Sequence, residues 1–269
     1  MITEYELYSD ERGVSPSGRR YLFVGGVVCT QTGRDRLLYS LSQVRSSYHL
    51  SREMKWEKVS LRYLEAYKSW VDVFFDDPFS RFSVLWVDLS SHDWQSFTPR
   101  PDRRASKDDR LASMFYQFLL VTFGPLRDTK RWWVYPDAGL FSRDTVLDRV
   151  EFLFNRTYKR AFGPKSSRII RLARSRDSRH TDIVQLADVL LGAFTFRILG
   201  SEPDSPAKHH LARYCSARLD REPRTCRGLE RLMVKKWQPP DRFKYTYGET
   251  PSNNDMQRTA LRAAADAER

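Results

Sequence analysis

The residues of this sequence that could do chemistry together are acidic, and they lie at four places, each at the end or on a face of a different predicted element. Carboxylates are the ligands that hard divalent cations prefer in proteins. Two such cations about 4 Å apart can activate water, neutralise a phosphate and stabilise a leaving oxygen. The pattern therefore predicts a Mg²⁺ or Mn²⁺ site that hydrolyses phosphodiester bonds. The candidate ligands are Asp10, Glu11, Glu53, Asp137 and Asp188, and all of them except Glu11 are also the predicted catalytic residues.

These acids depend on different elements for their positions. Asp10 and Glu11 end the first predicted strand, and Asp137 ends a later, apolar one. We assign Asp10 and Asp137 as core ligands, Asp188 as the ligand from a helix, and Glu53 as the ligand of a second metal ion. Neighbouring residues of a strand point to opposite faces, so Asp10 and Glu11 both reach the site only if the strand ends between them.

Asp188 is the most informative acid because its neighbours are apolar. A charge in such surroundings needs a cation or a hydrogen-bonded partner. Asp182 and Gln185 share its helical face at three-residue steps; Gln185 could orient it, whereas Asp182 is expected mainly as a helix-start acid. The other acids also have structural alternatives. Asp10 could cap a turn, Glu53 could be an exposed acid at a helix start, and Asp137 could cap a helix.

The overall charge favours a polyanionic partner. Lysine and arginine number 46 against 34 acidic residues, giving a net charge of +12. Such a chain attracts nucleic acid, unless its arginine content simply reflects the coding bias of its source. The polar segment 90–109 is predicted to be a loop that holds phosphates, or else a solvated connection that happens to be basic. The predicted nucleic-acid contacts are Lys55, Arg100, Arg103, Arg104 and Lys107.

Cysteine spacing and hydropathy indicate a cellular compartment. Cys29, Cys215 and Cys226 are widely spaced and lack the paired intervals of a structural zinc site, which fits a reducing cytoplasm. Residues 1–4 lack the basic start of a secretory signal, and no apolar run approaches the roughly 20 residues that span a bilayer. We therefore expect a soluble cytoplasmic protein without membrane contact, and leave its protein partners open.

Alternating strand and helix patterns predict one α/β domain over residues 1–249, followed by a flexible tail over 250–269. The predicted strands cover 4–10, 21–29, 82–89, 131–136 and 168–172. The predicted helices cover 33–50, 61–75, 111–123, 145–162 and 181–199, with additional C-terminal helices at 207–219 and 227–237. The glycine pair 25–26 in the second strand would let a helix or another backbone approach closely.

Other catalytic constellations are weaker. The sequence has no Walker lysine loop, dinucleotide glycine fingerprint or nucleophile elbow. The histidine pair 209–210 is expected to be solvated, because adjacent helical residues face apart. His180 could carry a proton near the site or simply neighbour a helix cap. The aromatic run 132–135 is expected to pack in the core rather than stack on bases.

Several short motifs, taken in order, resemble a known family. They lie at 8–13 (YSDERG), 21–28 (YLFVGGVV), 53–56 (EMKW), 134–137 (VYPD) and 185–188 (QLAD). Together they resemble the bacterial domain of unknown function 3800 family, over roughly residues 4–200. The resemblance implies a ribonuclease H-like fold, a mixed sheet flanked by helices. The opening motif of that family reads Asp-Glu-Ser-Gly, so Arg12 departs from it, and Pro136 removes a backbone donor beside Asp137.

Two functions follow for this α/β protein. The first is a nuclease that depends on Mg²⁺ or Mn²⁺ and acts on DNA or RNA. The alternative is a non-catalytic nucleic-acid-binding or protein-interaction module on the same fold, which Arg12 and Pro136 favour slightly. Charge and motif spacing do not distinguish DNA from RNA, or internal from terminal cleavage.

Overall fold

The computed structural model describes residues 4–90, 107–123, 131–139, 144–162, 170–201, 203, 205–221, 225–226, 229–230 and 232–236. The predicted tail at 250–269 lies outside these ranges and stays a prediction, as does the domain boundary at 249. Within these ranges, no helix combines the length and the apolar character needed to cross a bilayer.

The central sheet starts as an antiparallel meander. β1 (Glu4–Val14) pairs with β2 (Tyr21–Thr30), and β2 pairs with β3 (Arg81–Asp88), each antiparallel to its neighbour. Aromatic and β-branched side chains dominate β2 and β3, which is the composition typical of buried strands. The strand predictions for these segments are confirmed, but β1 does not end at residue 10. It continues to Val14 in register with β2.

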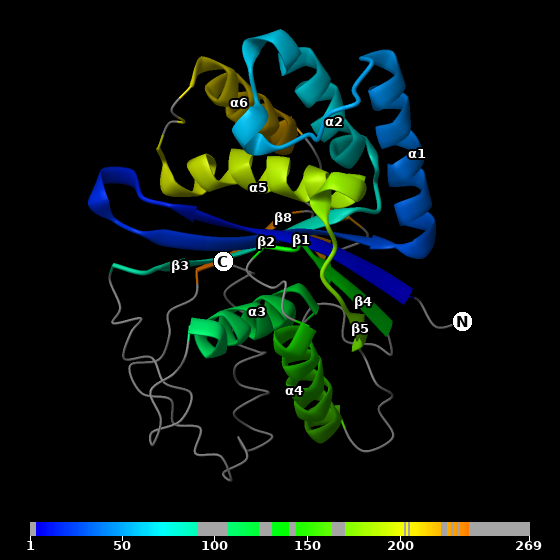
Figure 1. Cartoon of the computed structure of the whole chain (residues 1–269), viewed down its shortest axis with the longest axis vertical. Coiled ribbons are helices and arrows are strands. Elements are labelled where there is room, and N and C mark those ends of the chain that lie inside the picture. Colours follow the sequence, from blue (N-terminus) through cyan, green and yellow to red (C-terminus); the bar gives the residue numbers. More distant parts are fainter. Residues whose placement is uncertain are drawn as a thin grey trace.

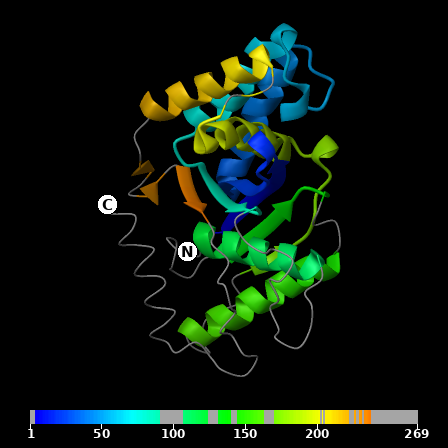
Figure 2. The ribbon, with the colours of Figure 1, turned by 90° about the vertical axis from the view of Figure 1, so that its left-hand side faces the viewer.

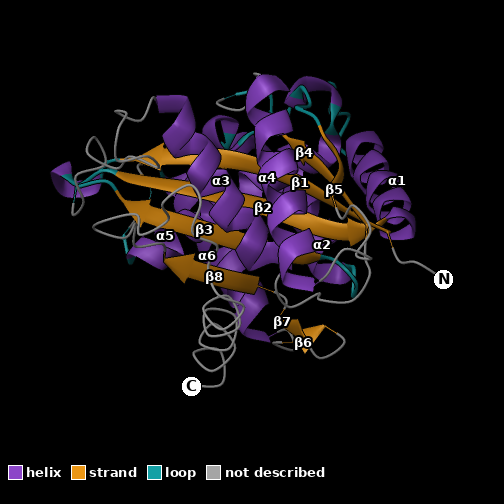
Figure 3. Cartoon of the chain, turned by 90° about the horizontal axis from the view of Figure 1, so that it is seen from below, coloured by secondary structure: helices purple, strands orange, loops and turns teal. Residues whose placement is uncertain are grey.

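Three strands extend the meander in parallel. β4 (Arg131–Pro136) pairs with β1, β5 (Ile170–Ala173) pairs with β4, and β8 (Leu232–Lys236) pairs with β3 at the opposite edge. The mixed, six-stranded sheet has the order β5-β4-β1-β2-β3-β8. β1 is therefore an inner strand with neighbours on both sides (Figure 3).

Helices cover both faces of the sheet, as the two side views show (Figures 1 and 2). One layer consists of α1 (Gln31–Ser47), α2 (Leu64–Asp76), α5 (Asp182–Leu199) and α6 (Pro206–Arg221), and the other consists of α3 (Lys107–Phe123) and α4 (Asp144–Phe162). Alternation along β1 sends Tyr8 into the core beneath α5 and Leu7 into the core against α3 and α4. Asp10 therefore shares the α5 face with Tyr8.

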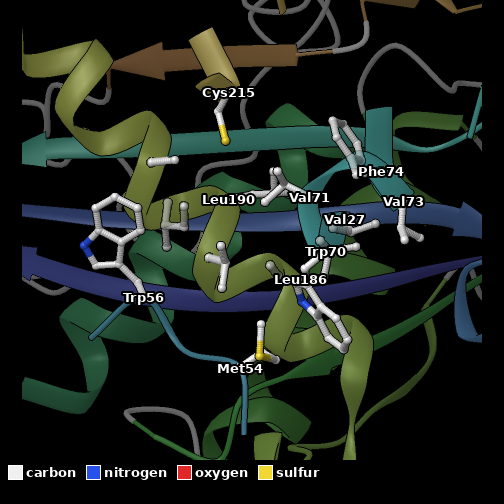
Figure 4. Packing of buried hydrophobic residues seen from close by; sticks show 14 of the residues in the cluster. Val27, Met54, Trp56, Trp70, Val71, Val73, Phe74, Leu186, Leu190 and Cys215 are labelled. Carbon is white, nitrogen blue, oxygen red and sulfur yellow. The ribbon is translucent and has the colours of Figure 1, made fainter. Parts of the chain in front are cut away.

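Glycines allow α5 to lie close to its neighbours. A Cβ atom added to Gly25 of β2 would lie 2.7 Å from Cδ1 of Leu191 on α5, so the prediction of a close helix approach at this glycine is confirmed. A Cβ atom added to Gly192 would clash with the ring of Trp56. Trp56 is fully buried, and Figure 4 shows it in the core that also contains Leu186 and Leu190 of α5. The segment before Trp56, which carries Glu53, is thereby held against the helix that carries Asp188.

The C-terminal prediction of a helix at 227–237 is wrong. The described residues there form β7 (Leu229–Glu230), which pairs with β6 (Thr225–Cys226), and then β8. β8 pairs in parallel with the edge of β3 from Phe82 to Trp86. Edge pairing satisfies backbone groups of both strands and overrides a local helical pattern. The helix at 207–219 is confirmed as α6, and Lys107 starts α3 instead of belonging to the predicted loop.

Candidate carboxylate site

Asp10 and Asp188 meet between β1 and α5. Asp10 is partly buried on the α5 face of β1, and Asp188 is buried on α5. Their side chains are hydrogen-bonded to each other, although 178 residues separate them (188 minus 10). Oδ2 of Asp188 also accepts a hydrogen bond of 3.0 Å from the backbone N–H of Trp56. The central feature of the predicted site, contact between the first-strand acid and the helical acid, is thus present.

Burial raises the pKa of both carboxyl groups. Burial, followed by the charges of Asp188, Glu11 and Asp137, raises the pKa of Asp10 well above its ordinary value. Burial also raises the pKa of Asp188, against the lowering effect of the Trp56 amide and of Arg12. A hydrogen bond between two carboxyls requires a proton on one of them, and two like charges so close favour keeping it.

Asp137 lies beside Asp10 because β4 is parallel to β1. Ser9 is paired with Pro136, and the N–H of Asp137 donates to the carbonyl of Ser9 at 2.8 Å. Oδ1 of Asp137 accepts from the N–H of Ala138 at 2.8 Å and from the N–H of Ser178 at 3.1 Å. Asp137 therefore combines a position next to Asp10 with a capping role for the turn that starts at Ser178.

Glu53 is held as an ionised carboxylate by three donors. Its Oε1 accepts from the Ser178 hydroxyl at 2.9 Å and pairs with Nζ of Lys55 at 3.1 Å, while Oε2 pairs with Nζ of Lys58 at 3.0 Å. Burial alone would raise the pKa of Glu53, but the hydrogen bonds from Lys58, Lys55 and Ser178 lower it. Glu53 and Asp137 are thus connected through Ser178.

Gln185 positions the segments that carry Glu53 and Asp137. Its Oε1 accepts from the N–H of Met54 at 2.7 Å, and its Nε2 donates to the carbonyl of Ser178 at 2.7 Å. The sequence suggested that Gln185 could orient Asp188; the hydrogen bonds of Gln185 run to the two segments that flank the helix and to Arg45. Ser178 was missed altogether, since a single serine in a polar segment gives no sequence signal.

Glu11 lies on the face of the sheet opposite Asp10. β1 continues through Val14, so the condition under which both acids could face one site is not met. Oε1 of Glu11 lies against Gly139, where an added Cβ atom would be 2.5 Å from it. Its charge still contributes to the raised pKa of Asp10. The assignment of Glu11 as a metal ligand stays a prediction, with a geometry less favourable than that of Asp10.

Two cationic side chains balance the acids. Lys55 pairs with Glu53; burial opposes its ionisation, but Glu53, Asp137 and Asp188 together raise its pKa. Arg12 pairs with Oε1 of Glu57 at 2.7 Å and helps to lower the pKa of Asp188. The departure at Arg12 from the family motif therefore places a positive charge next to the proposed site.

Other predicted residues have structural partners or lie outside the described ranges. Asp182 forms an ion pair with Arg45 at 2.6 Å, which agrees with its expected role as a helix-start acid. The aromatic run 132–135 packs in or against the cores, as predicted. The predicted phosphate contacts outside the described ranges are Arg100, Arg103, Arg104 and the side chain of Lys107.

The acids do not form a preassembled metal cage. In the described part of the chain, no group of three His, Cys, Asp or Glu side chains is arranged to hold a metal ion. Asp10 and Asp188 are in contact, and Asp137 is close enough to influence the pKa of Asp10, but Glu53 is tied to lysines. The donor set, entirely carboxylate oxygens, suits Mg²⁺ or Mn²⁺ in chemical type.

Comparison with protein-family models found no match, and comparison with curated proteins found none either. The resemblance to the domain of unknown function 3800 family therefore stays a prediction that rests on the motifs alone.

Proposed function

We propose that this protein is a divalent-metal-dependent nuclease in which Asp10, Asp137 and Asp188 hold Mg²⁺ or Mn²⁺ and Glu53 holds a second ion. The observation that supports the proposal is the contact between the buried carboxyl groups of Asp10 and Asp188, with Asp137 within electrostatic reach. Gathering like charges in a buried place destabilises a protein, and such clusters are common at functional sites. A purely structural role would be served better by one acid and one base.

The chain would contribute position and charge. A bound divalent ion supplies an activated water and neutralises charge on the phosphate. Asp10 and Asp188 would hold the ion through their carboxylate oxygens, and Ser178 keeps Glu53 and Asp137 in place. Lys55 pairs with Glu53 and is within electrostatic reach of Asp137 and Asp188, so it could contact the phosphate of a bound substrate.

We also propose that the fold is that of a ribonuclease H-like domain, and the sheet supports this. An antiparallel meander whose first strand is extended by parallel strands is the arrangement such a domain requires, and β1 through β5 follow it. The acid on β1 lies on an inner strand, and the acid after β4 lies next to it. The net charge of +12 supports nucleic acid as the substrate.

The direct test is cleavage by the purified full chain. Labelled single-stranded and double-stranded DNA and RNA are incubated with Mn²⁺ or Mg²⁺, and parallel reactions contain EDTA. We expect cleavage of at least one substrate with the metal and none with EDTA. Cleavage of equal extent in EDTA would contradict the proposed mechanism, and absence of cleavage for all four substrates with either metal would contradict the nuclease.

A second function, a non-catalytic nucleic-acid-binding module, is favoured by one observation. Glu53 is neutralised by Lys55 and Lys58, so this acid is satisfied without a metal ion. Calorimetric titration with Mn²⁺ separates the two functions. Heat of binding that disappears in Asp188→Asn supports the nuclease, whereas no binding at millimolar Mn²⁺, together with salt-sensitive binding of nucleic acid, supports the module.

A further inference from the structure

A pocket of about 440 Å³ lies beside Glu53. It is bounded by the end of α1, by residues 50–53 and by the start of α5, and Tyr8, two residues before Asp10 on β1, also lines it. Its volume is within the range of small-molecule sites, and its lining is mainly polar or charged. In Figure 1 the start of α5 is the end that faces α1. The pocket therefore adjoins the carboxylate site and shares Glu53 with it.

Two of the arginines that line the pocket are neutralised by carboxylates. Arg45 donates to Asp182 and Gln185 and to the carbonyls of Leu50 and Arg52, which uses all five N–H groups of its guanidinium. Arg45 is therefore a structural part of the pocket wall, because its N–H groups are already used. Arg179 pairs with Asp177 through Nε and Nη2, at distances down to 2.7 Å, and no described residue engages its Nη1.

Arg52 is different from both. It donates to the carbonyl of Lys58 at 3.1 Å, bonds to the hydroxyl of Tyr67, and lies over the ring of Tyr63 with its Cζ 4.3 Å from the ring centre. None of these partners is a carboxylate, so in the described part of the chain the positive charge of Arg52 is not neutralised by an ion pair. A guanidinium whose plane is fixed by an aromatic ring is well suited to bind a phosphate through two parallel hydrogen bonds.

The start of α5 adds a weaker attraction for anions. α5 has 18 residues, and its N-cap Thr181 makes no side-chain capping hydrogen bond. The N-terminus of such a helix carries a partial positive charge. Asp182 in the first turn opposes this charge, but its carboxylate is engaged by Arg45. Leu38 and Leu50 add apolar surface to the same pocket, enough for part of a sugar or a base.

We propose that this pocket, defined by Arg52, Arg179 and the start of α5, binds a phosphate group of a nucleic-acid strand. The proposal rests on the proposed function for its substrate class. A phosphate held by Arg52 would place the adjoining nucleotide beside Glu53, and a neighbouring phosphodiester would then lie toward Asp10 and Asp188. The pocket gives the strand a fixed register relative to the acids, which a general positive charge does not.

Binding without metal tests the pocket separately from cleavage. A short single-stranded oligonucleotide with a 5′-phosphate and a 3′ fluorophore is titrated with the full chain in EDTA, and anisotropy is recorded. We expect Arg52→Ala to raise Kd at least about tenfold, because it removes the charge-assisted hydrogen bonds to the phosphate, and Arg52→Lys to raise it less. The salt dependence of log K should also become shallower by about one in Arg52→Ala.

Arg62→Ala is the matched control. Arg62 also lies over the ring of Tyr63, at 5.2 Å, but it is exposed and does not line the pocket. The Arg62→Ala variant should bind within about twofold of the wild type, because Arg62 does not line the pocket and its loss removes only an exposed charge. Thermal unfolding of each variant establishes that the fold is intact. Arg179→Ala provides a second variant in case Arg52→Ala does not fold.

The outcomes are distinct. Wild-type affinity in both Arg52→Ala and Arg179→Ala, or equal losses in Arg62→Ala, would overturn the pocket. Competition by a 5′-mononucleotide or inorganic phosphate that is as strong as competition by the oligonucleotide would contradict a nucleic-acid strand as the ligand. It would indicate a small phosphate compound instead. A chain that cleaves nothing but shows the Arg52 effect would refute the nuclease while supporting the pocket. A chain that cleaves without an Arg52 effect would refute the pocket alone.

Discussion

Asp10→Asn and Asp188→Asn are each expected to lower metal-dependent cleavage by about 100-fold or more. Removal of a residue that merely supports a metal ligand costs about 10- to 100-fold, and these residues are assigned as the ligands themselves. Asparagine keeps the size of the side chain and can still hydrogen-bond to the remaining carboxyl, so the contact between β1 and α5 should persist. Initial cleavage rates at saturating Mn²⁺ measure the effect.

A control substitution distinguishes the site from general charge. Asp35 is exposed on α1 and pairs with Arg34 rather than with any of the site acids. Asp35→Asn makes the same change in charge and should retain the wild-type rate within about twofold, because exposed ion pairs contribute little. Wild-type cleavage rates in both Asp10→Asn and Asp188→Asn would remove the carboxylate pair from the mechanism.

The same substitution at Asp10 should stabilise the metal-free protein at neutral pH. The pKa of Asp10 is raised in the folded state, mainly by burial, so the folded state holds a proton that the unfolded state has lost above about pH 4. Stability therefore falls as pH rises from about 4 through the folded pKa. Asparagine does not titrate. Asp10→Asn should therefore be more stable than the wild type at pH 7, and the difference should vanish below about pH 4, where the carboxyl is protonated in both the folded and the unfolded state.

Urea unfolding with EDTA, repeated from pH 4 to 8, measures this gain. Addition of Mn²⁺ should then reverse the order of stabilities at pH 7, because only the wild type gains free energy from binding the ion. If Asp10→Asn is less stable than the wild type by the same amount at pH 7 and at pH 4, ionisation of Asp10 does not destabilise the folded protein.

The sequence predicted the sheet well because its strands carry their own signal. β2, β3 and β4 are runs of aromatic and β-branched residues bounded by turns, and these local patterns need no tertiary information. The segment that became β8 lacks such a boundary, and its residues pair with β3 only because the chain returns to that edge. Its structure depends on a contact between residues about 150 positions apart, taking Phe82 and Leu232 as the pair.

The positions of the acids could be predicted where they depend on the place of a residue along a single strand or helix. Asp10, Asp137 and Asp188 each follow from the place of an acid on a strand or helix, and parallel pairing of β4 with β1 brings the strand acids together. The face on which Glu11 lies could not be predicted, because the extent of β1 depends on pairing with β2 beyond residue 10. The partners Ser178 and Lys58 could not be predicted. They contact Glu53 from irregular segments, and hydrophobic periodicity does not predict the path of such segments.

Gln185→Leu should destabilise the fold by about 3 kcal/mol or more. Gln185 is fully buried and links Met54, Ser178 and Arg45 through hydrogen bonds of 2.7 to 2.9 Å. Leucine fills a similar volume but leaves a buried N–H and a buried carbonyl without their partner, and each such group costs about 1–3 kcal/mol. In a protein of this size the melting temperature should fall by about 10 °C, at roughly 2–4 °C per kcal/mol.

The same network makes Gln185 a positioning residue for the carboxylates, and its replacement should therefore weaken Mn²⁺ binding beyond any loss of stability. When the segments at Met54 and Ser178 are no longer held, Glu53 loses the Ser178 hydroxyl and Asp137 loses the Ser178 amide.

Gln43→Leu, the same change at an exposed position of α1, should alter neither melting temperature nor Mn²⁺ affinity. Gln185→Glu keeps the acceptor for Met54 and Arg45, so it should fall between the wild type and Gln185→Leu in Mn²⁺ affinity at temperatures where all three are folded. A Gln185→Leu protein that binds Mn²⁺ as tightly as the wild type would separate this network from the site and leave it a purely structural connection between α5 and its neighbouring loops.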